Sequence, residues 1–167
     1  VTYCNHSALF HKVQAETLWE DAVKNVKNLL PAEFVTMNHA LKSLLGDVEY
    51  EEGDLLLEKK KDYDQMYVLS NKFRNYGAAC IAYPNVLEMI GQILKKDYYI
   101  LPSSVHEVII VPYSEIYVCS KLDEMVREIN STQVEEEDVL SNHVYLYDRV
   151  SGKLRVGSSV QTGRMMA

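Results

Sequence analysis

The chain is poor in features that mark several common classes of protein. It has three cysteines in 167 residues, scattered as Cys4, Cys80 and Cys119. The absence of a C-x-x-C pair argues against both a disulfide framework and a structural zinc site. No apolar run approaches the roughly 20 residues that span a bilayer. The first residues carry neither the basic stretch nor the apolar stretch of a signal peptide. We therefore expect a cytoplasmic protein, and the start at Val1 indicates a processed chain or a fragment.

An excess of positive charge is also missing. Lys and Arg number 17 against 24 acidic residues, which gives a formal net charge of −7. An acidic surface repels phosphate backbones and anionic lipid head groups, so we expect no nucleic acid and no membrane among the partners. The seven glycines do not cluster into a phosphate-binding loop, and the five histidines follow no metal-ligand spacing. No cofactor and no metal are expected.

Apolar residues make up 47% of the chain, which is enough for the core of one domain of this length. Apolar residues at helical spacing predict four helices. These cover 15–30, a short segment after Thr36 as N-cap, 84–94, and a segment capped by Ser120 with Asp123 in a capping box. Strands are predicted at 66–70, 76–83, 98–101 and 106–111, followed by a hairpin of 144–147 and 153–156.

These elements predict an α+β fold. We expect an antiparallel sheet of about five strands with helices mainly on one face, in the order α-α-β-β-α-β-β-α-β. A single domain covers residues 1–156. Within it the charged stretch 47–64 is interpreted as a linker or surface excursion, and 157–167 as a flexible tail.

Three phrases within residues 66–149 carry a family resemblance, namely MYVLSNKFRNYGAACIAYPNVL, YYILPSSVHEVIIVP and LDEMVREINSTQVEEEDVLSNHVYLYDR. They resemble the C-terminal part of a family of uncharacterised bacterial proteins, a domain of unknown function found mainly in Gram-positive anaerobes. The earlier segment LWEDAVKNVKNLLPAEF is similar to the region that precedes this block in such proteins. The resemblance supports the division into elements and implies no substrate, cofactor or catalytic residue.

The segment Pro102 to Glu107 holds a close cluster of nucleophile, base and acid types, in Ser103, Ser104, His106 and Glu107. A serine hydrolase needs a hydroxyl within hydrogen-bond reach of an imidazole, with an acid behind it. In an extended chain Ser104 and His106 share a face but stand about 6.6 Å apart along the strand, and Glu107 points to the other face. The alternative is a purely structural role, in which the serines form a turn after Pro102 and the hydrogen-bonding groups of His106 have partners at the end of the sheet.

Tyrosine is abundant, at 12 residues. Tyr113 and Tyr117 flank the loop before the last long helix, where an aromatic face is typical of protein-binding surfaces and equally of ordinary packing. From these features we rank a non-catalytic interaction module first, with a protein partner or self-association. The alternatives are a serine-hydrolase-like enzyme using Pro102 to Glu107, and a small-molecule-sensing domain.

Overall fold

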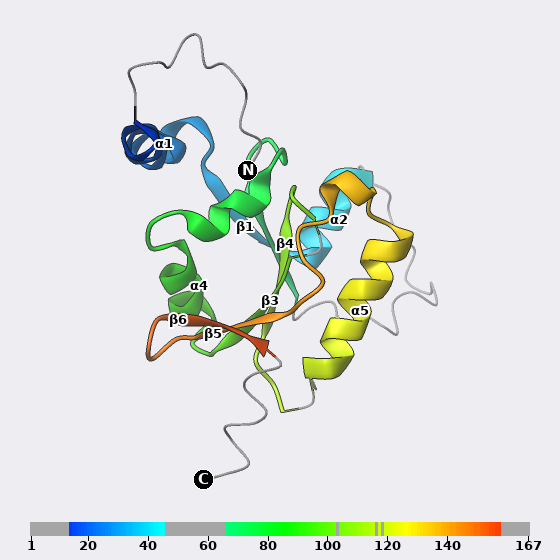
Figure 1. Cartoon of the computed structure of the whole chain (residues 1–167). Helices are drawn as coiled ribbons and strands as arrows, with labels where there is room; N and C mark the ends of the chain where they lie inside the picture. The colour runs from blue at the N-terminus through cyan, green and yellow to red at the C-terminus, as the bar shows by residue number, and fades with distance from the viewer. Residues whose placement is uncertain (1–13, 46–65, 103, 116, 118, 158–167) are drawn as a thin grey trace.

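The computed structural model describes residues 14–45, 66–102, 104–115, 117 and 119–157. In these residues six strands form one antiparallel sheet in the order β1-β2-β4-β3-β5-β6 (Figure 1). The strands are β1 Ala32–Thr36, β2 Tyr67–Asn71, β3 Tyr98–Leu101, β4 Val108–Pro112, β5 Tyr145–Asp148 and β6 Lys153–Val156. The predicted α+β class with an antiparallel sheet is confirmed.

Helices lie on both sides of this sheet, whereas the sequence predicted them mainly on one. The α-helices are α1 Ala15–Leu29, α2 Met37–Leu45, α4 Val86–Leu94 and α5 Cys119–Thr132, and the 3₁₀ helices are η1 Gly77–Ala82 and η2 Glu136–Asp138. Figure 1 shows α4 and α5 on opposite sides of the strands. The reason lies in β3 and β4, whose successive residues are apolar on both faces and therefore need cover on both.

Each face of the sheet has its own hydrophobic cluster. The first packs η1 and α4 on the sheet and contains Leu69, Ala78, Cys80, Ile90, Tyr98, Ile100, Val108, Ile110 and Tyr147. The second packs α5 on the sheet and contains Tyr99, Leu101, Val111, Cys119, Leu122, Val126, Val144 and Leu146. Consecutive residues of β3 alternate between the two clusters, as the period of two in a strand requires. The predicted central position of the strand at 106–111 is confirmed, since β4 lies between β2 and β3.

The predicted strand at 76–83 is wrong, because Gly77–Ala82 forms the 3₁₀ helix η1. Tyr76, just before it, has a φ of 50°, in the left-handed region that turns an extended chain aside. The Ala79 N–H then donates to the Tyr76 carbonyl at 3.2 Å, the i to i+3 bond of a 3₁₀ turn. The small side chains that indicated close packing do provide it, against the face of β2 and not within the sheet.

The strand that pairs with β2 in place of residues 76–83 is β1, which the sequence analysis did not predict. Phe34 of β1 stacks on Tyr67 of β2, with ring centroids 4.9 Å apart. Thr36 ends β1, and its hydroxyl oxygen accepts the backbone N–H of His39 at 3.2 Å. The predicted N-cap of the second helix is therefore confirmed. The five residues before α2, including Thr36 itself, form the strand β1 and not a simple connection.

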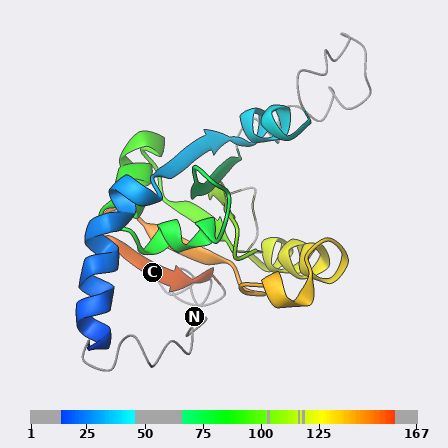
Figure 2. The same cartoon turned by 90° about the horizontal axis from the view of Figure 1, so that it is seen from above.

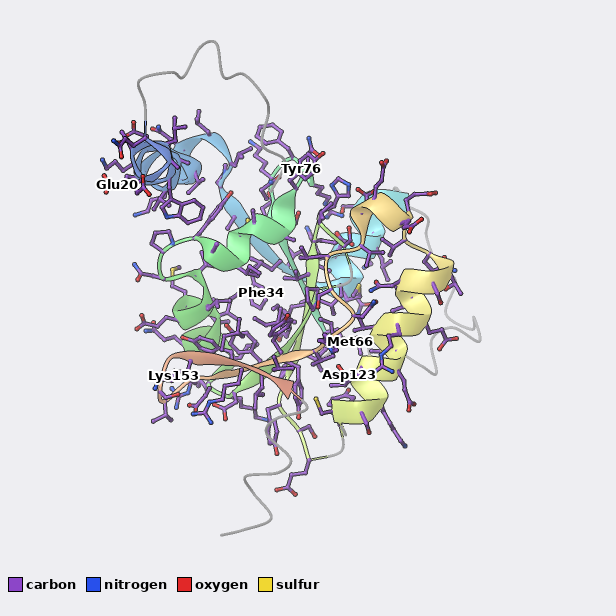
Figure 3. The ribbon with its side chains drawn as sticks, in the orientation of Figure 1. Glu20, Phe34, Met66, Tyr76, Asp123 and Lys153 are labelled. Atoms are coloured by element: carbon purple, nitrogen blue, oxygen red, sulfur yellow. The ribbon has the colours of Figure 1, made fainter. Side chains whose placement is uncertain are left out.

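Most other predicted elements are present within a residue or two of their expected limits. The helix at 15–30, the hairpin of β3 and β4, and the final hairpin of β5 and β6 are all confirmed. The predicted cap at Ser120 is wrong, because α5 already begins at Cys119 and the Asp123 carboxylate accepts the Val144 N–H at 2.8 Å instead. Figure 3 shows Asp123 on the side of α5 that faces the sheet.

Two predicted segments fall outside the described residues. The charged stretch 47–64 lies wholly within the gap 46–65, and 158–167 covers nearly all of the expected tail. Gly157, placed at the start of that tail, is buried, and its N–H donates to the Val144 carbonyl at 2.7 Å. The described part of the chain thus reaches one residue beyond β6.

Candidate functional site

The loop between β3 and β4 is fastened by backbone contacts on two sides. The Val105 N–H donates to the Asp138 carbonyl at 2.9 Å, and the Val105 carbonyl accepts the Ala78 N–H at 3.1 Å. Ser104 adds an isolated antiparallel bridge with Val139. η1 and the segment around η2 therefore hold this loop from opposite sides, which fixes the position of the side chains that follow.

The His106 imidazole uses both of its nitrogens. Its Nδ1 accepts the backbone N–H of Tyr76 at 3.2 Å, so the ring proton of the neutral form lies on Nε2. Nε2 stands 3.5 Å from Oδ1 of Asp138, with both side chains about one third exposed. The Tyr76 ring lies against the imidazole with centroids 5.5 Å apart and planes at 41°. These contacts orient the imidazole as part of the architecture of the sheet end.

The Ser104 hydroxyl is engaged with the backbone and not with the imidazole. Its Oγ accepts the backbone N–H of His106 at 3.0 Å, the geometry of a local serine turn. Ser103 lies outside the described residues, and Glu107 is half-buried just before β4. A hydrolase would need an imidazole nitrogen free to take a hydroxyl proton. The geometry brings Ser104 and His106 together through the main chain and leaves neither imidazole nitrogen directed at Ser104.

The contacts around His106 depend on residues that the sequence analysis did not select. The Ser70 hydroxyl donates to the His106 carbonyl at 2.8 Å, beneath Gly77. A Cβ on Gly77 would overlap the Ser70 hydroxyl and come within 2.5 Å of the His106 carbonyl oxygen. A glycine two residues after the turn that closes at Asn75 was the sequence signal for this close approach.

Tyr113 and Tyr117, the candidate binding residues, are both half-buried and pack against the α5 cluster of the core. The Tyr113 ring lies 5.7 Å from that of Tyr99, with the planes at 37°. Much of their aromatic surface therefore already has a partner within the domain.

The two described cysteines are poor nucleophiles. Burial raises the pKa of the Cys80 thiol, which also donates to the Ser70 carbonyl at 3.3 Å. Burial, together with the nearby Asp123 carboxylate, raises the pKa of the Cys119 thiol. Because the thiolate is the reactive form, both environments oppose reaction near neutral pH.

Helix α1 has no buried residue, whereas α4 and α5 both contain buried residues. Its apolar stripe includes Trp19, 61% exposed, and Leu29, 66% exposed, with Leu18 and Leu30 near 40%. The helix lies at the outer edge of the molecule in both Figure 1 and Figure 2. A four-turn helix with an amphipathic pattern normally buries such a stripe.

Membrane-spanning helices and metal sites were also sought among the described residues. Among the described helices, none has both the length and the apolar character that a bilayer crossing requires. Their histidine, cysteine, aspartate and glutamate side chains form no group of three or more that could hold a metal ion.

Comparison with protein-family profiles matches residues 3–149 to a family of unknown function, DUF5688. No significant match was found among curated proteins or among solved structures. The comparisons therefore give a family and no activity.

Proposed function

The chain belongs to the DUF5688 family of unknown function, and from this premise we propose that it is a non-catalytic module that binds another protein through helix α1. One observation carries the proposal, namely that α1 has an apolar stripe with no buried residue. Trp19, the largest side chain of the stripe, is 61% exposed.

An exposed stripe of this kind is costly in water. Apolar surface contributes about 25 cal/mol per Å² when it leaves water, and tryptophan is among the residues most enriched in binding hot spots. The other long helix, α5, uses its apolar side fully, with Leu122 and Val126 almost completely buried. The contrast between α5 and α1 supports a partner for α1.

A protein fits this stripe better than a membrane surface does. Amphipathic helices that lie on membranes carry mainly Lys and Arg on the polar side. The polar side of α1 carries three acids, Glu16, Glu20 and Asp21, against two lysines, Lys24 and Lys27. Combined with the net charge of −7, this balance opposes anionic lipids and nucleic acid. The proposed setting is the cytoplasm of a bacterium.

Photo-crosslinking in the native cells tests the proposal. A benzophenone side chain introduced at Trp19 should give an adduct with a protein that mass spectrometry identifies. The matched position is Thr17, which is exposed and lies on the polar side of the same helix. Adducts from position 17 equal to those from position 19, or none from position 19, would overturn the proposed function.

A further inference from the structure

The geometry points to a second copy of this chain as the partner of α1, with the two α1 helices paired antiparallel about a twofold axis. This inference rests on the proposed function and names the partner. It is carried by the distribution of charge along α1 and by the position of its small residue.

The charges of α1 are divided by sign along the helix. Glu16, Glu20 and Asp21 occupy the first half, while Lys24 and Lys27 occupy the second. In a parallel pair the acids of the two helices would lie side by side, as would the lysines. Lys24 already pairs with Asp21 of the same helix, with 3.7 Å between Nζ and Oδ1. Glu16 and Lys27 border the apolar stripe, and in an antiparallel pair Glu16 of each helix lies beside Lys27 of the other, so the helix is complementary in charge to a reversed copy of itself.

The positions of the apolar residues agree with the same arrangement. Ala22 lies at the middle of the helix and within the stripe, where a small side chain lets two helix axes approach closely. Leu18 and Val26 are each four residues from Ala22, so each would meet the other across the twofold axis. Glu16 and Lys27 lie on the same flank of the stripe, near opposite ends, and would form two symmetric ion pairs.

Among the described residues, α1 lies outside the core of the domain. In Figure 1 and Figure 2, α1 and α5 lie on opposite sides of the molecule. Figure 3 shows Glu20, on the polar side of α1, at the outer rim, and within the stripe Val23 and Val26 are half-buried while Trp19 and Leu29 are exposed. No residue of α1 takes part in either hydrophobic cluster of the domain. Pairing α1 with a second copy would therefore not require the domain core to open.

Sedimentation equilibrium of the full chain from about 5 to 500 µM, a range that spans moderate affinities, tests the pairing. The wild type should show a concentration-dependent monomer–dimer equilibrium. Trp19→Glu should weaken it by about tenfold or more, because a charge would enter the interface. Thr17→Glu adds the same charge on the polar side and should leave the equilibrium unchanged. Ile93→Glu should also leave it unchanged, and Ile93 is a fair control because it is a helical apolar residue 60% exposed.

A charge swap distinguishes the antiparallel pair from other dimers. Glu16→Lys alone and Lys27→Glu alone each turn two attractive pairs into repulsive ones and should weaken dimerisation about tenfold. The double variant recreates both pairs with reversed sign and should return the dissociation constant close to that of the wild type. If the double variant instead weakened dimerisation by the sum of the two single effects, the antiparallel arrangement would be overturned.

The outcomes separate this inference from the proposed function. A monomer at every concentration, together with a Trp19 adduct to a different protein in cells, overturns the pairing and leaves the binding role of α1 intact. A dimer that Ile93→Glu dissociates and Trp19→Glu does not would also overturn the pairing. If position 19 gives no crosslinked adduct, both the pairing and the proposed function are overturned.

Discussion

Replacing Gly77 by alanine should destabilise the protein more than its small size suggests. The added Cβ would overlap the Ser70 hydroxyl and come within 2.5 Å of the His106 carbonyl oxygen and 2.7 Å of the Asn71 nitrogen. Two of these three atoms are backbone, so rotation of a side chain cannot relieve the overlap. η1 would have to move away from β2 and from the loop that carries His106.

The expected cost follows from two contributions. Overpacking of a tight site costs about 1–3 kcal/mol. Loss of the partly buried Ser70 to His106 hydrogen bond, 2.8 Å long, adds about 1–2 kcal/mol. The sum of about 2–5 kcal/mol is a large share of the 5–15 kcal/mol typical of a domain, and it corresponds to a fall in Tm of about 10 °C.

Chemical denaturation followed by circular dichroism measures this change, with Gly91→Ala as the matched control. Gly91 is also buried, but a Cβ there would first meet the flexible Arg149 side chain at 3.0 Å, and alanine favours the helix that surrounds it. We expect Gly91→Ala to change the free energy of unfolding by less than about 1 kcal/mol. If Gly77→Ala proved no more destabilising than Gly91→Ala, the close approach of η1 to β2 would be refuted.

Three further predictions concern single side chains. Asp123→Ala should lower the free energy of unfolding by about 2 kcal/mol, because it leaves the Val144 N–H without its acceptor; Asp123→Asn keeps an oxygen there and should cost less, and an equal loss would contradict the hydrogen-bond role. Burial, and secondarily a neighbouring tyrosine, raises the pKa of Tyr98 above its ordinary value of 10.0, so its contribution to stability is complete below that pH and is lost as the pH rises above it. Urea titrations at about pH 9 to 11, a range that spans the ordinary pKa of tyrosine, measure this loss. The free energy of unfolding should decline less steeply with pH in Tyr98→Phe than in the wild type, and parallel curves would contradict this assignment. A fluorophosphonate probe should leave Ser104 unlabelled, and labelling lost in Ser104→Ala would revive the hydrolase hypothesis.

The sequence predicted the elements whose signal is local. Helix α1, the β3–β4 hairpin and the Thr36 cap follow from periodicity and from capping chemistry that neighbouring residues supply. The strand pairing of β2 could not be predicted in this way. Residues 76–83 have the composition of a closely packed strand, but the left-handed φ angles of Arg74 and Tyr76 turn the chain aside before η1. β1 was missed because its exposed edge position requires no clear alternation of apolar residues.

The contacts of the loop that holds the candidate residues could be predicted from the sequence only where they are local. Ser104 and His106 lie close together in the chain, so their proximity follows directly from the sequence. Asp138 and Tyr76, which contact the imidazole, are about 30 residues away on either side. Their approach depends on how η1 and η2 pack around the loop, and no pattern of neighbouring residues encodes that packing.

The edges of the sheet support α1 as the interface by a separate argument. An open edge strand offers unpaired backbone groups to another chain, and proteins oppose this with short strands and charged side chains. The described edge strand β6 has only four residues, and Lys153 and Arg155 alternate along it. The opposite edge strand β1 is five residues long, partly exposed, and carries Glu33. Pairing through either edge is therefore opposed by charge and short length, whereas the stripe of α1, which includes the exposed Trp19, has no such protection.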